Sequence, residues 1–170
     1  MPENKVTPEP VGQLRTRIQA EPIEAPFADA SWRPGRDFAE VIDEVRRAHP
    51  DLHVAGVGYS PGWGWKWEPG ALERRRADMT TPGNVEAFEA AIRFLSYAGR
   101  EFARPRVNRK RTSYSWKHVA ERVMGVYVPN GMLIAAAYAL GFTVEVNRDS
   151  PNPYINLAER AVELDPQRGM

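Results

Sequence analysis

The chain has 170 residues, a formal net charge of +1 and no cysteine. This length allows one domain with a hydrophobic core and is too short for two ordinary domains. The lack of cysteine excludes disulfide scaffolds, thiolate zinc sites, iron–sulfur clusters and cysteine nucleophiles.

The first 34 residues contain six prolines and few apolar side chains at a regular period. A segment of this kind buries too little apolar surface to offset the entropy lost when it orders. We therefore expect residues 1–34 to form a disordered arm and residues 35–170 to form a single domain. The alternative for the arm is a segment that folds onto a partner or a second subunit.

A first helix is predicted over residues 37–48, because apolar side chains recur on one stripe and Asp37 is placed to cap it. Residues 52–59 have the pattern of a strand, residues 60–62 that of a turn, and residues 63–67 that of a return strand. Together they predict a first β-hairpin.

This hairpin would carry a stripe of four aromatic side chains, since alternate residues of a strand share one face. They are Tyr59, Trp63, Trp65 and Trp67. Buried, the stripe would seal the sheet against the helices, which is the commoner role. Exposed, it would bind a partner by stacking on bases, sugars or proline rings.

A second helix is predicted to begin at Pro82, with Thr81 as its cap, and to fade near Gly99. Residues 104–111 have the composition of a solvated connector. A third helix follows, capped by Ser113, with an apolar stripe that includes Trp116 and with Gly125 as its stop.

Residues 131–140 predict a fourth helix that is apolar on every side and therefore buried. Strands at 142–146 and 154–156 predict a second hairpin, and residues 157–164 a short final helix. The expected fold is α+β, a small mixed helical domain with two short β-hairpins. The order of its last elements is compatible with a winged-helix-like C-terminal half, although the fourth helix offers only Tyr138 to reach base edges.

No catalytic, metal or cofactor signature is complete. Residues 58–62 match the G-x-S-x-G elbow of serine hydrolases, but Pro61 has no N–H for an oxyanion hole. The three histidines, His49, His53 and His118, lack the helical spacing of a metal site. We expect a protein that is not an enzyme and has no cofactor.

Residues 1–11 are polar, and no apolar run approaches the roughly 20 residues that cross a bilayer. The expected location is the cytoplasm, without membrane contact.

Residues 104–122 contain seven basic residues and one acid, Glu121, with aromatic side chains between them. Guanidinium and ammonium groups displace the counterions of nucleic acids, and hydroxyls donate to phosphate oxygens. The candidate nucleic-acid contacts, including one arginine in the turn of the second hairpin, are Arg104, Arg106, Arg109, Lys110, Arg111, Ser113, Tyr114, Lys117, His118, Arg122 and Arg148. The alternative is a basic, solvated connector without a ligand.

Part of the chain resembles a recurrent block in short uncharacterised proteins of bacterial phages and plasmids. The block spans residues 113–156 and consists of Ser113-Tyr114, Lys117-His118, Tyr127-Val128, Asn130-Gly131, Ala135-Ala136, Leu140-Gly141-Phe142, Pro151-Asn152 and Asn156. The resemblance implies a mobile-element setting and supplies no catalytic residue. Packing explains most of the block, with Asn130 and Asn156 expected as helix caps.

The leading hypothesis is a nonenzymatic nucleic-acid-binding accessory or regulatory protein that contacts the phosphate backbone, of DNA rather than RNA, through residues 104–122. The alternative is a protein–protein interaction module of a mobile element that inhibits or adapts a host machine. That module would use the tryptophan strand and the proline-rich arm.

Overall fold

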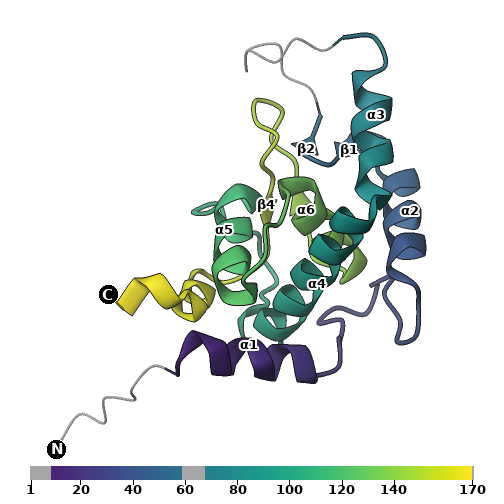
Figure 1. Ribbon diagram of the computed structural model, residues 1–170. Helices are drawn as coiled ribbons and strands as arrows, with labels where there is room; N and C mark the ends of the chain where they lie inside the picture. The colour runs from purple at the N-terminus through teal and green to yellow at the C-terminus, as the bar shows by residue number, and fades with distance from the viewer. Residues whose placement is uncertain (1–8, 59–67, 170) are drawn as a thin grey trace, which may run out of the picture.

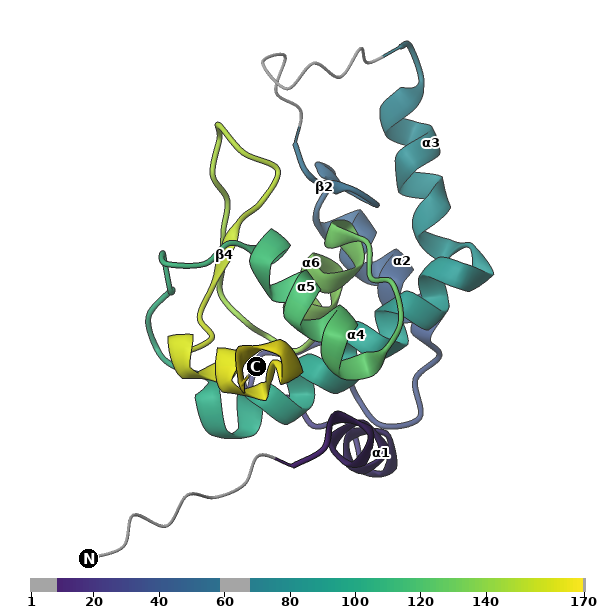
Figure 2. The same cartoon turned by 60° about the vertical axis from the view of Figure 1, so that its left-hand side comes forward.

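The computed structural model describes residues 9–58 and 68–169. Helix α6 (Asn130–Ala139) is surrounded by α4 (Pro82–Phe102), α2 (Phe38–Ala48) and α5 (Ser113–Met124), as Figures 1 and 2 show. Two antiparallel sheets of two strands each complete the fold. The predicted small α+β domain with two short hairpins is confirmed.

Helix α6 is buried along its whole length except at Tyr138, as its apolar sequence predicts. Its first turn touches another backbone directly, because Gly131 N–H donates to Val54 O at 2.9 Å. A Cβ added at Gly131 would lie only 1.8 Å from His53 O. With α6 buried in this way, it cannot serve as the exposed recognition helix of a winged-helix-like half.

Helices α2 and α4 begin where the sequence predicts them. The Asp37 carboxylate accepts the Glu40 N–H at 3.1 Å and so caps α2. Thr81 stands at the N-cap of α4, but its hydroxyl donates to Asp78 O instead of accepting from the helix. Helix α4 also continues past the predicted end at Gly99. This glycine is buried inside the helix, where Pro26 and Phe142 approach closely and leave little room for a side chain.

Residues 9–34 fold onto the rest of the domain. Helix α1 (Val11–Ala20) contacts α4 and α5, with Leu14 and Ile18 buried. Further along, Trp32 is 6% exposed and donates its indole N–H to Ile23 O. The expectation of a disordered arm is therefore corrected for residues 9–34. Leu14 and Ile18 are spaced by one helical turn, so even a proline-rich segment has an apolar stripe to bury.

The first hairpin turns earlier than predicted. Strand β1 (Leu52–His53) pairs with β2 (Gly56–Val57), and Leu52 lies opposite Val57. The predicted strand 52–59 is therefore wrong. Val54 and Ala55 form the turn between the two strands, and Gly58, just after β2, has a φ of 75°. The predicted turn and return strand at 60–67, and the four aromatic residues with them, lie outside the described residues.

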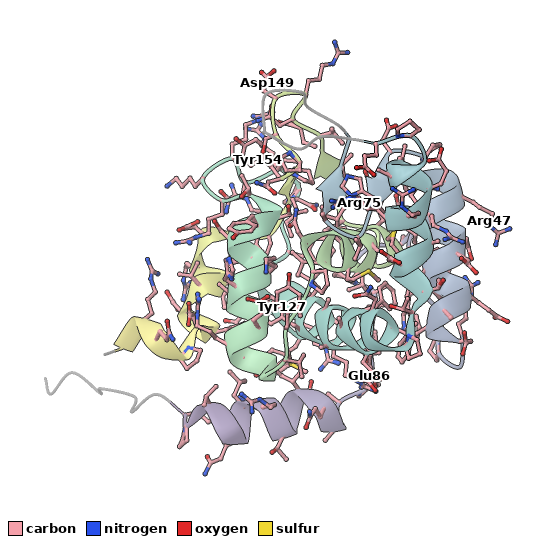
Figure 3. All side chains as sticks on the ribbon, turned by 45° about the horizontal axis from the view of Figure 1, so that its top comes forward. Arg47, Arg75, Glu86, Tyr127, Asp149 and Tyr154 are labelled. Carbon is pink, nitrogen blue, oxygen red and sulfur yellow. The ribbon has the colours of Figure 1, made fainter. Side chains whose placement is uncertain are left out.

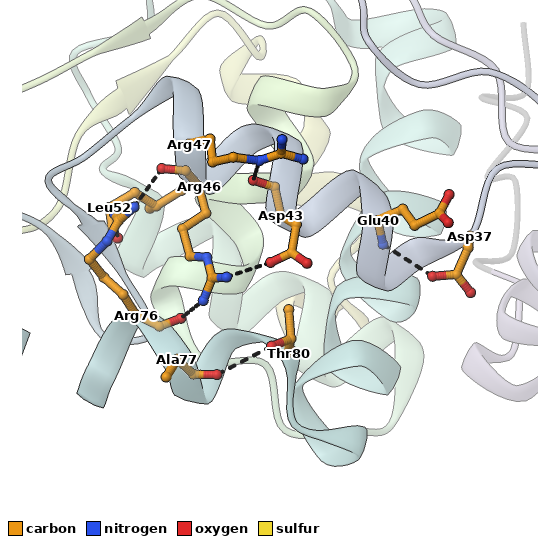
Figure 4. A network of polar contacts seen from close by, with 9 residues as sticks. All are labelled: Asp37, Glu40, Asp43, Arg46, Arg47, Leu52, Arg76, Ala77 and Thr80. Atoms are coloured by element: carbon orange, nitrogen blue, oxygen red, sulfur yellow. Dashed lines mark hydrogen bonds and ion pairs between the residues drawn. The ribbon is translucent and has the colours of Figure 1, made fainter. Parts of the chain in front are cut away.

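No element is predicted for residues 71–80, which form helix α3 (Ala71–Ala77) and the 3₁₀ helix η2 (Asp78–Thr80). Arg76 donates to Leu52 O and Arg46 O, each at 2.6 Å, and Arg46 donates back to Arg76 O at 2.8 Å (Figure 4). The last carbonyls of a helix lack partners within the helix. These arginines supply donors near the end of α2 and join it to α3.

The C-terminal part follows the prediction with shifts of one or two residues. Helix α5 ends at Gly125, whose φ is 73°. Strands β3 (Val144–Glu145) and β4 (Tyr154–Ile155) pair antiparallel. The final helix is a 3₁₀ helix, η3 (Glu159–Leu164), and is followed by η4 (Pro166–Gly169). It begins later than predicted, because Ala158 N–H bonds to Phe102 O.

Within the ranges that the structure covers, every helix is too short or too polar to pass through a bilayer.

Candidate nucleic-acid interface

Residues 103–112, here called the connector, run antiparallel to residues 153–157, which include β4 (Figure 2). Asn108 is buried, and its side-chain amide donates to Leu157 O at 3.0 Å. Three backbone bonds also fix the connector: Arg104 N to Asn156 O at 3.0 Å, Asn108 N to Ile155 O at 2.9 Å and Ser113 N to Pro153 O at 2.7 Å. The predicted solvated connector thus has a fixed backbone, and its exposed cations are Arg104, Arg106, Arg109 and Lys110.

Four of the predicted contact residues are exposed cations without a carboxylate partner in the described part of the chain. They are Arg104, Arg106, Lys110 and Arg148, here called the open cations. Three of them lie on the connector, and Arg148 lies in the loop between β3 and β4. That loop rises beside the connector, with Asp149 near its tip and Tyr154 at its base (Figure 3).

The other three arginines of the predicted interface form ion pairs within the chain. Arg109 Nε and Nη2 donate to Glu145 at 2.7 and 2.6 Å, Arg111 Nε donates to Glu159 at 2.8 Å, and Arg122 Nε donates to Asp165 at 2.8 Å. These three candidate contacts are therefore not free cations. Carboxylates from residues 145–165 neutralise these three side chains.

These pairs differ in their exposure. The Arg109 side chain is 69% exposed, and its hydrogen bond with Glu145 raises the pKa of Arg109 and lowers that of Glu145. Burial alone would raise the pKa of Asp165, but hydrogen bonds from Arg122 and from the Gln167 N–H outweigh it and lower that pKa. The ion pair between Arg122 and Asp165 is therefore largely shielded from solvent, whereas the ion pair between Arg109 and Glu145 is exposed to it.

Lys117 and His118 share one carboxylate, that of Glu121. Lys117 Nζ donates to Glu121 Oε1, and His118 Nδ1 lies against Oε2, both at 2.7 Å. The Val128 N–H also donates to Oε1, at 3.1 Å. Only 5% of the Lys117 side chain is exposed. Lys117 is thus a buried, neutralised cation, and the prediction that it contacts a ligand is corrected.

The pKa of Glu121 reflects two opposing effects. Burial raises it, while hydrogen bonds from Lys117, from the Val128 N–H and from His118 together lower it below the ordinary value. The carboxylate consequently stays ionised at neutral pH. A histidine held by a carboxylate is the usual arrangement of a general base. Here the same carboxylate also neutralises a buried lysine, so packing already explains the cluster.

Two tyrosines flank Lys117. Its Nζ lies 5.4 Å from the ring centroid of Tyr114 and 4.7 Å from that of Tyr127. Tyr114 is 49% exposed and Tyr127 is 73% exposed. Tyr114 was among the predicted contacts, whereas Tyr127 was not. The only sequence signal for Tyr127 is its place in the resembling block, two residues after Gly125, where α5 ends.

Ser113 is fully buried, so it cannot contact a ligand at the surface. Ser113 is also not the cap of α5, because Thr112 occupies the N-cap position. Asn130 and Asn156 are also not caps. Asn130 Nδ2 donates to Asn152 Oδ1 at 2.9 Å, and Asn156 joins Arg104 O to the Thr143 N–H. These amides hold the second hairpin against α6 and the connector.

Among residues 9–58 and 68–169, no group of three or more histidine, aspartate or glutamate side chains could hold a metal ion. The aromatic stripe of the alternative function, Tyr59, Trp63, Trp65 and Trp67, lies outside the described residues, so that function stays a prediction.

The chain matches no known protein family, no curated protein and no solved structure.

Proposed function

We propose that this protein binds the phosphate backbone of nucleic acid, DNA rather than RNA, through the open cations, as a nonenzymatic accessory or regulatory protein. One observation carries the proposal. Arg104, Arg106 and Lys110 are exposed side chains without a carboxylate partner in the described chain, on a connector whose backbone is hydrogen-bonded to residues 153–157. Because the backbone that carries these side chains is already fixed, little backbone entropy is lost when they meet phosphates.

Arg109 extends this surface. It belongs to the same connector, and its partner Glu145 is itself 38% exposed. Exposed ion pairs are weak because water screens them. A phosphate can therefore replace Glu145 as the partner of Arg109. Arg111 and Arg122 are more deeply placed and keep their carboxylates, so they support the fold.

The test is the salt dependence of binding to a fluorescein-labelled DNA oligonucleotide, measured by fluorescence anisotropy. Each phosphate neutralised on a duplex contributes about −0.9 to the slope of log K against log salt concentration. The open cations predict a slope of roughly −3 to −4. Arg106→Gln and Lys110→Gln should each make the slope shallower by about 1.

The matched control is Arg47→Gln, which removes the same charge from α2, on the other side of the view from Tyr154 (Figure 3). It should leave the slope unchanged. The proposal fails if the wild-type protein shows no binding at low ionic strength. It also fails if Arg47→Gln weakens binding as much as Arg106→Gln does.

A further inference from the structure

Three of the four large apolar side chains that are exposed in the described chain lie on α5 or just after it, and the fourth, Val146, follows β3. Tyr114, Val126 and Tyr127 lie on the first turn of α5 and on the loop that follows this helix. Tyr127 is visible at the surface in Figure 3. We call Tyr114 and Tyr127 the tyrosine pair.

Both tyrosine rings pack against the side chain of Lys117. The Lys117 ammonium contacts both rings, and Glu121 fixes that ammonium through a 2.7 Å ion pair. The Tyr114 ring also meets the His118 ring edge to face, with centroids 4.6 Å apart. A cation under an aromatic ring is an attractive contact. The exposed parts of both rings are therefore positioned before any ligand arrives.

Tyr114, one of the pair, also lies close to the open cations along the chain. Only three residues separate Lys110 from Tyr114. Surfaces that bind single strands combine cations along the backbone with aromatic rings on which bases stack. The bases of a duplex are already stacked on one another and cannot reach a ring outside the helix.

We propose that the tyrosine pair stacks on unpaired bases, so that the ligand of this surface is single-stranded nucleic acid. This inference rests on the proposed function and specifies its ligand. A second observation favours a single strand over a duplex. The helix that would enter a major groove, α6, is buried at every residue except Tyr138.

The experiment compares a labelled single-stranded 20-mer with the duplex of the same sequence, by fluorescence anisotropy at one low salt concentration. Wild-type protein should bind the single strand more tightly. Loss of a base stack costs about 1–3 kcal/mol, which corresponds to roughly a 5- to 150-fold loss of affinity. Tyr127→Leu should therefore weaken single-strand binding about tenfold or more while leaving the salt slope unchanged.

Two further variants separate stacking from folding and from hydrogen bonding. Tyr127→Phe keeps the ring and should retain wild-type affinity, since stacking does not need the hydroxyl. Tyr97→Leu makes the Tyr-to-Leu change on α4, where that ring lies under Arg17 instead, and should leave binding unchanged. Circular dichroism of each variant confirms that it is folded.

The outcomes distinguish this inference from the proposed function. If neither oligonucleotide binds in a salt-dependent manner, the proposed function itself is wrong. If both bind but the duplex binds equally well, or if Tyr127→Leu binds like wild type, phosphate binding stands and the stacking inference is overturned. Unchanged binding by Tyr127→Leu would mean that the tyrosines make another contact, such as one with a protein surface.

Discussion

Replacing Glu121 by glutamine should destabilise the protein by about 3 kcal/mol. The substitution keeps the shape of the side chain but leaves Lys117, only 5% exposed, without a counter-charge. Breaking a buried ion pair by removing one partner costs roughly 3–5 kcal/mol. We take the lower end because Glu121 is 17% exposed and glutamine still accepts one hydrogen bond.

The assay is urea unfolding followed by circular dichroism at pH 7. With an m value of about 2 kcal/mol/M, the midpoint should fall by about 1.5 M. The folded-state pKa of Glu121 lies below its ordinary value of 4.5. Its contribution to stability is therefore complete above that value and is lost as the pH falls through the folded-state pKa. The difference between wild type and Glu121→Gln should shrink accordingly in acid.

The control is Glu163→Gln, which makes the same change in an exposed pair. Glu163 and its partner Arg160 are 57% and 75% exposed, and their atoms lie 3.4 Å apart. This control should cost less than about 1 kcal/mol. Adding Lys117→Met to Glu121→Gln should recover part of the loss, because it removes the orphaned charge. Equal effects of the two glutamate variants, or a difference that does not shrink in acid, would refute the reasoning.

Two further predictions concern packing, and urea unfolding tests both. Gly131→Ala would place a Cβ 1.8 Å from His53 O and should lower the free energy of unfolding by at least about 3 kcal/mol. Gly83→Ala, whose Cβ would have nothing within 4 Å, should raise the free energy of unfolding by about 0.5 kcal/mol. Similar effects of the two variants would contradict the close contact at Gly131. Ile18→Ala removes a side chain that is 2% exposed and should cost about 3 kcal/mol. Gln19→Ala, at an exposed position of the same helix, should change the free energy of unfolding little. Equal losses of stability in the two variants would mean that α1 does not pack on α4 and α5.

Helices with several concordant local signals were predictable from the sequence. Helix α2 has a capping aspartate and one apolar stripe, α4 begins with proline, and α5 ends at Gly125. Each signal acts within a few residues, so no tertiary information is needed to recognise it. The burial of α6 was equally clear, because a helix that is apolar on all sides has no face for water.

The candidate site was harder to predict because its electrostatics are not local. Arg109, Arg111 and Arg122 are paired with carboxylates 36 to 48 residues further along the chain. A count of charges along the sequence cannot show such pairing. Lys117 was predicted to contact a ligand, but the loop after α5 folds back and covers it with Tyr127.

The position of α6 in the chain has a consequence for synthesis of the protein. Helices α2 and α4 both pack on α6, yet residues 130–139 are made after them. While the ribosome is still making residues 100–129, the apolar faces of those earlier helices have no central partner. Nascent chains that stop before residue 130 should therefore bind chaperones and be digested readily by protease, and resistance should appear only once α6 has emerged.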